Sequence, residues 1–358
     1  NFKSFYINEP VISILQRNNG ELWIGTWNHG LIQYADYGLH HSVHNIELTL
    51  LNEYKRKAED TNSLISNTVQ KIFEDSHNRL WIGTNNGLDV FDEKNRRFVH
   101  FTAKQNQESI SHNGIQSNAF IEDTEKNLWI GTWDGLNRIK IPQNWDFDPE
   151  KVEIMNFFSN PDDPASLNDN RIVSLNINQD NTLWIGTYGG GINKMLTLPD
   201  SVEQHKPEFI HYTEKQGLAN NSVYSILFDQ KGNIWAATNR GLSKFNIQSK
   251  TFKNYHRKDG LQHEQFFWGA GLKTKNGKMY FGGINGFNCF FPDSIPQSTK
   301  FPPLHLVNFH VFNKTVLPGE KINGKVILKK SIDETHNITL SYQHNFFSIE
   351  FAALDYSG

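Results

Sequence analysis

The chain has 358 residues, of which 37% are hydrophobic, 20% charged and 13% aromatic, a composition typical of a globular protein that can bury a sizeable core. Its formal net charge is −3 and Lys and Arg are spread along the chain, which argues against the basic surface that nucleic-acid binding requires. The single cysteine, Cys289, excludes intrachain disulfides and cysteine-ligated zinc, and no apolar run approaches the roughly 20 residues of a membrane-spanning helix.

A five-residue unit, Leu-Trp-Ile-Gly-Thr, recurs along the chain. Four copies are identical and two later copies are weaker, at positions 22–26, 80–84, 128–132, 183–187, 234–238 and 279–283. Successive Trp or Tyr residues of the unit are 58, 48, 55, 51 and 45 residues apart. Periods of this size are typical of propeller blades.

Each repeat predicts four short antiparallel strands. In the second repeat an alternating strand at Val69–Glu74 is followed by a polar turn, the Trp strand, a tight turn at 85–87 and strands at 88–91 and 97–101. No repeat contains an amphipathic helix, which excludes helical solenoids. The sequence therefore predicts an all-β propeller of four-stranded blades, in which the recurring Trp packs between blades and the Gly after it lets the next blade approach.

The number of blades stays open at this point. Residues 2–6 resemble the fourth strand of a later repeat, 251–255, and the sixth repeat, 266–291, lacks a fourth strand of its own. The first strand could complete the sixth blade and close a ring of six. It could equally end an upstream blade of a ring of seven.

After Pro302-Pro303 the repeat ends and short alternating segments follow at 304–312, 325–328, 338–342 and 347–351. They predict the start of an immunoglobulin-like β-sandwich, truncated because so short a segment cannot supply seven strands. We therefore expect a propeller at 1–298 and the N-terminal part of a sandwich at 299–358.

The pattern Asn-x-Val-x-x-Ile, then Asp, then Leu-Trp-Ile-Gly-Thr-x-x-Gly-Leu resembles the two-component-regulator propeller repeat. The tail from Ile338 through Tyr342, Phe346 and Phe351 to Tyr356 resembles the opening of the three-tyrosine (Y-Y-Y) domain that follows such propellers. Together they are similar to the periplasmic sensor half of hybrid two-component systems of Bacteroides-type bacteria. There, two seven-bladed propellers and a Y-Y-Y sandwich precede a membrane helix, a histidine kinase, a receiver and a DNA-binding domain.

This resemblance implies a function and a location. The chain would be the second propeller and part of the sandwich of an inner-membrane sensor, facing the periplasm and joined to the membrane only through a helix outside this sequence. The resemblance implies an oligosaccharide ligand, control of polysaccharide-utilisation genes, a homodimeric parent receptor and a ring of seven blades. The parent chain would be a histidine kinase, whereas this fragment would be neither an enzyme nor a cofactor-binding protein.

Candidate ligand-binding residues follow the repeat Thr. If the Trp strand is the second of each blade, the turn after it opens on the same face as the connections between blades, where propellers usually bind ligands. Aromatic rings there suit the C–H faces of a sugar, and Asn, Asp and Arg suit its hydroxyls or a carboxylate. The candidates are Trp27, Asn85, Trp133, Asp134, Tyr188, Asn239 and Arg240. The alternative is that they only form turns and cover neighbouring blades.

Recurring polar residues are interpreted as structural. We expect Asn67, Asn170 and Asn221, each fourteen residues before a repeat Trp, to bind the backbone of the connecting loops. The recurring acids Asp75, Asp123 and Asp229 fit turns, whereas glycoside cleavage requires two carboxylates at one place. The histidines at 40, 41 and 44 are not predicted to hold a metal, because no further ligand is evident.

Two other functions remain as alternatives. The propeller could be a scaffolding or dimerisation element whose ligand site lies elsewhere in the parent protein. Less favoured is a propeller glycosidase or lyase, since a fold of this kind can host an enzyme but a site must be argued from its residues.

Overall fold

The computed structural model describes residues 7–35, 49–105, 108–196, 207–295 and 304–353. Its contacts divide the chain into two units, Asn1–Ser294 and Ile295–Gly358, and each unit is described by itself. All regular elements of the described residues are strands or single turns of 3₁₀ helix. None of the helices among these residues is long and apolar enough to cross a membrane.

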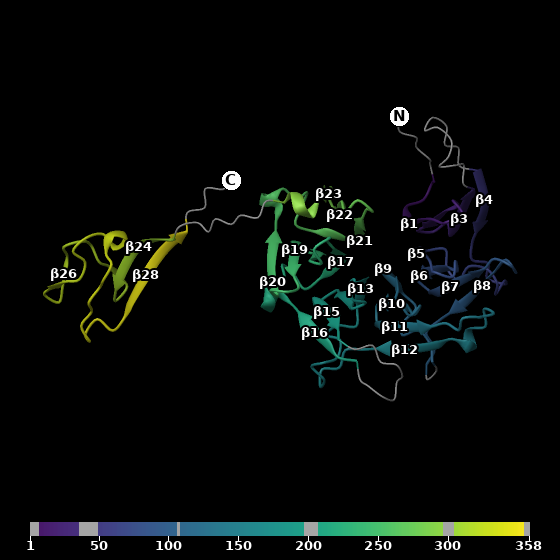
Figure 1. The fold of residues 1–358 in the computed structure, drawn as a ribbon, viewed down its shortest axis with the longest axis horizontal. Helices are drawn as coiled ribbons and strands as arrows, with labels where there is room; N and C mark the ends of the chain where they lie inside the picture. Colours follow the sequence, from purple (N-terminus) through teal and green to yellow (C-terminus); the bar gives the residue numbers. More distant parts are fainter. Residues whose placement is uncertain (1–6, 36–48, 106–107, 197–206, 296–303, 354–358) are drawn as a thin grey trace. The chain divides into compact units, whose positions relative to one another are not determined.

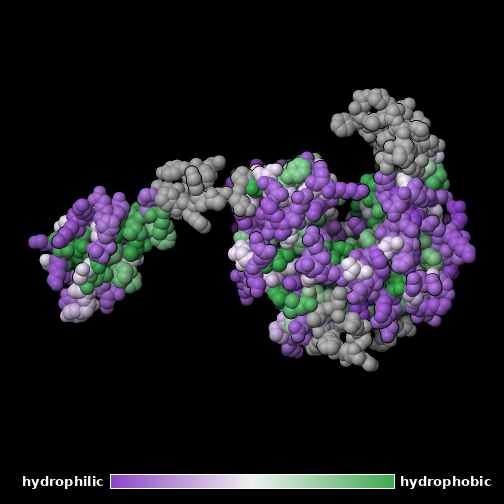
Figure 2. All heavy atoms as spheres, viewed as in Figure 1, coloured by the Kyte–Doolittle hydropathy of each residue, from purple (hydrophilic) through white to green (hydrophobic). Residues whose placement is uncertain are grey.

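The first unit consists of six consecutive antiparallel blades whose first strands gather at the centre, as Figure 1 shows. Blades 3 and 4 are joined into one sheet by a parallel pairing between their first strands. Hydrophilic residues cover most of the face of this unit that Figure 2 shows. Blades 1 to 3 contain β1 (Val11–Gln16), β2 (Leu22–Thr26), β3 (Leu31–Ala35), β4 (Thr49–Tyr54); β5 (Val69–Glu74), β6 (Leu80–Thr84), β7 (Gly87–Asp92), β8 (Arg97–Phe101); and β9 (Ile115–Glu122), β10 (Leu128–Thr132), β11 (Gly135–Lys140), β12 (Glu153–Phe157). Blades 4 to 6 contain β13 (Ile172–Ile177), β14 (Leu183–Thr187), β15 (Ile192–Met195), β16 (Phe209–Tyr212); β17 (Val223–Phe228), β18 (Ile234–Thr238), β19 (Gly241–Asn246), β20 (Thr251–Tyr255); and β21 (Phe266–Lys273), β22 (Met279–Gly283), β23 (Gly286–Phe290).

Short 3₁₀ helices lie in the connections, at η1 (Pro149–Lys151), η2 (Glu214–Gln216), η3 (Arg257–Asp259) and η4 (Pro292–Ser294). The all-β propeller predicted from the sequence is confirmed, and the Trp strand is the second of each blade, as predicted. The sixth blade has three strands among the described residues. The N-terminal segment 1–6, which was considered as its fourth strand, lies outside them.

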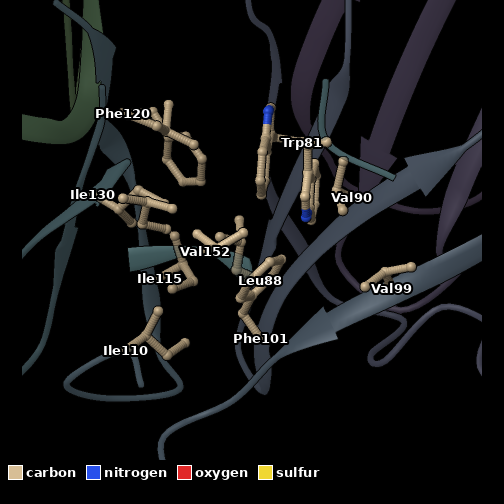
Figure 3. Packing of buried hydrophobic residues seen from close by; sticks show 13 residues of the cluster. Trp81, Leu88, Val90, Val99, Phe101, Ile110, Ile115, Phe120, Ile130 and Val152 are labelled. Atoms are coloured by element: carbon tan, nitrogen blue, oxygen red, sulfur yellow. The ribbon is translucent and has the colours of Figure 1, made fainter. Parts of the chain in front are cut away.

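The repeat Trp and Gly pack one blade against the next. Trp81 of blade 2 is fully buried and shares a core with Ile115, Phe120 and Ile130 of blade 3 (Figure 3). A Cβ atom on Gly83 would lie 2.7 Å from Cγ2 of Ile115 and 2.8 Å from Cε2 of Phe120. Both predicted roles are therefore confirmed. The Trp packs between two blades, and the Gly has no side chain where the next sheet approaches.

A buried aspartate holds the turn between the first and second strands. Oδ1 of Asp123 accepts the backbone N–H of Glu125 and Asn127, both at 2.9 Å. Its Oδ2 accepts Asn127 Nδ2 at 2.9 Å and the indole Nε1 of Trp129 at 2.8 Å. The carboxylates of Asp75 and Asp229 also accept backbone N–H groups of their turns and the indole of their repeat Trp. The interpretation of these acids as turn residues is confirmed.

Blade 4 carries Asn178 at this position. Its Oδ1 accepts the backbone N–H of Asp180 and Thr182, but Nε1 of Trp184 is buried without a hydrogen-bond partner among the described residues. We expect Asn178→Asp to supply the missing acceptor and to raise the free energy of unfolding by about 1 kcal/mol. Urea denaturation of the two proteins measures the difference. An unchanged or lower midpoint would contradict this role for the indole.

Blades 1 and 6 each have one sheet face that does not pack on another described blade. On blade 1 it is the face opposite to blade 2, and on blade 6 the face opposite to blade 5. Ile14 of blade 1 is 64% exposed, although its equivalent in blade 2, Ile72, is 2% exposed. Phe287 of blade 6 is 64% exposed, whereas its equivalent Leu88 is fully buried. A ring closed directly from blade 6 to blade 1 would bury both side chains. The described parts of blades 6 and 1 therefore do not pack directly on each other, and the number of blades in the parent ring stays a prediction.

The second unit is small and partly irregular. It contains β24 (Leu304–Val311), β25 (Lys314–Thr315), β26 (Lys321–Ile322), β27 (Lys325–Val326), η5 (Ile332–Glu334) and β28 (Phe347–Ala353), with sheets in the order β25-β24-β28 and β26-β27. The strand predicted at 338–342 is wrong. Ile338 and Leu340 instead pack as irregular chain on a core that includes Phe309 and Val311. The sandwich and the boundary at 298/299 stay predictions.

Candidate functional site

The turns after the Trp strands and the connections between blades lie at the same end of the sheets. In blade 3 Oγ1 of Thr132 donates to the carbonyl of Gly135 at 3.0 Å and accepts the N–H of Asp134 at 3.2 Å, which fixes the turn. Asn67, Asn170 and Asn221 accept backbone N–H groups of the preceding connections at 2.7, 2.6 and 2.8 Å. Their predicted role in holding the loops is confirmed.

Four aromatic side chains from four blades meet at this end of the propeller. The ring centroid of Trp268 lies 5.5 Å from that of Trp133, 5.7 Å from Tyr188 and 6.2 Å from Tyr224. Trp133 and Tyr188 are 6.0 Å apart at 73°. We call these four residues the aromatic platform. Trp268 is 40% exposed, so the platform presents ring surface to solvent.

An ion pair borders the platform at Tyr188. The guanidinium of Arg171 lies 5.0 Å from the ring centroid of Tyr188 and donates from Nε and from its terminal nitrogen to Asp169 at 2.9 and 2.6 Å. The hydrogen bond to Asp169 raises the pKa of Arg171. A Cβ on Gly189 would lie 2.7 Å from this guanidinium. The Gly-rich turn thus leaves space for the ion pair beside the ring.

Tyr224 is 3% exposed and lies beneath the other rings' exposed surface, and this burial raises the pKa of its phenol. The platform therefore offers the exposed ring of Trp268, the partly buried rings of Trp133 and Tyr188, and one neutralised cation. Such a surface suits a ligand with C–H faces and hydroxyls.

The structure brings together two of the predicted site residues, Trp133 and Tyr188. Asp134 follows Trp133, is exposed, and accepts Asn170 Nδ2 at 2.9 Å. Asn239 and Arg240 lie in the exposed turn of blade 5, their backbones bonded to Ser222 and Thr238.

The other two predicted residues belong to blades 1 and 2. Trp27 is 49% exposed, and among the described residues no ring packs on it. The side-chain carbonyl of Asn85 accepts Gln70 Nε2 at 2.7 Å. Neither residue is in contact with the aromatic platform.

Sequence comparison of the repeats missed Tyr224 and Trp268, because both lie in first strands rather than in the turns. For Trp268 a signal was nevertheless present. Asn113 and Glu264 lie sixteen residues before the repeat aromatics Trp129 and Tyr280, whereas Asn67 lies fourteen before its own. This extra length lies in the innermost strands β9 and β21.

No cluster of three or more His, Cys, Asp or Glu side chains with metal-binding geometry occurs among the described residues. The histidines at 40, 41 and 44 lie outside them. The recurring acids Asp75, Asp123 and Asp229 each accept a backbone N–H of their own turn.

Four segments of the chain match the two component regulator propeller family, at residues 6–28, 63–86, 166–189 and 217–240. Histidine kinase P4 of Formosa agariphila is 28% identical over 353 residues, which cover 98% of this chain and 20% of that protein. The chain therefore spans about a fifth of the curated relative it matches.

Two solved structures are also similar to this chain. The extracellular domain of BT3049 from B. thetaiotaomicron, described as a hybrid two-component system, is 25% identical with a TM-score of 0.63, and the match covers 96% of this chain and 41% of that one. PorZ of Porphyromonas gingivalis, a surface component of the type-IX secretion system, is 13% identical with a TM-score of 0.60 over 86% of this chain and 45% of that one. The second similarity shows the fold alone.

Proposed function

We propose that this chain, four segments of which match the two component regulator propeller family, is the extracytoplasmic sensing part of a hybrid two-component histidine kinase, with an oligosaccharide as its ligand. The parent receptor is a homodimeric inner-membrane protein that faces the periplasm and controls polysaccharide-utilisation genes. This part of the receptor binds its ligand without turning it over.

The aromatic platform is the observation that carries this proposal. Its rings come from blades 3 to 6 and meet at the loop end, where a repeat protein can vary side chains without disturbing its packing. Exposed rings bind the apolar faces of a pyranose, and the exposed carboxylate of Asp134, next to Trp133, binds its hydroxyls. The similarity to the extracellular domain of a described two-component system supports the sensing role.

A microarray of plant, algal and host oligosaccharides, followed by calorimetry with the strongest binder, tests the proposal. We expect Trp133→Ala to weaken binding about tenfold, equivalent to about 1.4 kcal/mol, because it removes a ring of the platform. Trp27→Ala is the matched control, since Trp27 occupies the same repeat position away from the platform, and it should change affinity less than twofold.

Three results would contradict the proposal. They are an array on which the wild-type protein binds no glycan, equal losses in the two Trp variants, and cleavage products after incubation with the bound sugar. Cleavage products would favour the alternative that the propeller is a glycosidase.

A further inference from the structure

Two innermost strands depart from the register of the others. In blades 1, 2, 4 and 5 the first strand carries one extra residue opposite the second, as between Val69 and Lys71. In β9 the residues 116–119 face Gly131 alone, and in β21 the residues 267–270 face Gly282 alone. These two larger bulges account for the longer spacing seen in the sequence of blades 3 and 6.

The two bulges meet, although they belong to blades three positions apart. A Cβ on Gly269 would lie 2.5 Å from Oγ of Ser117 and 3.6 Å from Cβ of Asn118. Gly269 also has a φ of +69°, which favours glycine. Asn118 in turn pairs with Ser174 of blade 4. The bulge of blade 6 is therefore supported by β9 near the centre of the blades.

This support determines where Trp268 lies. The indole follows Phe267 and precedes Gly269, and it contacts a ring from each of blades 3, 4 and 5. It is the one platform residue that comes from a bulge of this size. Phe267 is 59% exposed and lies 6.5 Å from Trp268.

We propose that Trp268 binds the ligand of the aromatic platform, and that the contact of Gly269 with Ser117 sets its position and hence the affinity. The proposal rests on the proposed function for the nature of the ligand. It adds a binding residue from the last blade and a contact that positions this residue. Because aromatic stacking depends on ring orientation, a displaced bulge weakens binding even when every ring is present.

The affinity test uses calorimetry with the strongest binder from the oligosaccharide microarray. Trp268→Ala should weaken binding at least tenfold, and Trp268→Phe, which keeps a smaller ring if the alanine variant folds poorly, about threefold. Phe267→Ala is the control on the same bulge and should change affinity less than threefold. Gly269→Ala should weaken binding at least fivefold, because its Cβ would meet Ser117 and because a φ of +69° disfavours alanine. Ser117→Gly combined with it removes only the first of these effects and should recover part of the loss.

A second measurement needs no sugar. In protein labelled with 5-fluorotryptophan, the Trp268 resonance, identified by its loss in Trp268→Phe, should shift in Gly269→Ala and return toward its original position in the double variant. An unmoved resonance overturns the positioning contact. Wild-type affinity in Trp268→Ala and Trp268→Phe, with a loss in Trp133→Ala, overturns the role of Trp268 while leaving the proposed function intact. If no sugar binds the wild-type protein, both fail.

Discussion

Asp123→Ala is expected to lower the free energy of unfolding by about 3 kcal/mol. The carboxylate is 4% exposed and accepts four hydrogen bonds, including one from the fully buried indole of Trp129. Alanine leaves these donors without an acceptor in a site that water reaches poorly. Each donor then stays buried without a hydrogen bond, which destabilises the folded state. Urea denaturation followed by tryptophan fluorescence measures the change.

Asp123→Asn separates the two functions of the carboxylate. Its oxygen can still accept the backbone of the turn, as Asn178 does in blade 4, but its amide cannot accept the indole. We expect a loss about half that of alanine. Equal stability of Asp123→Ala and the wild-type protein would show that the turn does not depend on this residue.

The fold could be predicted because its determinants repeat. Each Trp and Gly of the five-residue unit meets the same kind of surface in the next blade, so one interpretation of Trp81 and Gly83 holds for the other identical copies. Beyond the last repeat, the strands predicted from the sequence were less accurate. The segment at 338–342 alternates like a strand, but Ile338 and Leu340 reach the core without a partner strand.

The candidate site could be predicted only in part, because a repeat gives a position within a blade but not its place in the ring. Trp27 and Trp133 occupy the same place in their blades, yet only Trp133 meets other rings. What distinguishes them is that Trp133 meets Tyr188 of the next blade and Trp268 of the bulge in blade 6. Sequence spacing shows that this bulge is longer, but not which residues it meets.

A second large effect is expected at Asp89, which is fully buried. Its carboxylate accepts the N–H of Ile65 at 2.8 Å and lies 2.6 Å from Nδ1 of His100, whose Nε2 lies 2.8 Å from the carbonyl of Thr61. Asp89→Ala removes the partner of both groups and should lower the free energy of unfolding by about 3 kcal/mol. Asp89→Asn should cost less, because Asn137 accepts the equivalent backbone N–H in blade 3 at 2.7 Å.

The pH dependence identifies the charge on His100. Both ring nitrogens face oxygen acceptors, and the hydrogen bond to Asp89 raises the pKa of His100 above its ordinary value of about 6.5. Burial raises the pKa of Asp89 as well, against the effect of the hydrogen bond from His100. The folded state therefore holds this proton more tightly than the unfolded state, so the pair's contribution is complete below about pH 6.5 and is lost as pH rises through the raised pKa. The urea midpoints of the wild-type protein and of Asp89→Asn should converge as the pH rises from 6 to 9. The wild-type protein loses the contribution of the pair over this range, whereas the variant lacks the ion pair. A constant difference across this range would show that His100 is neutral in the folded protein.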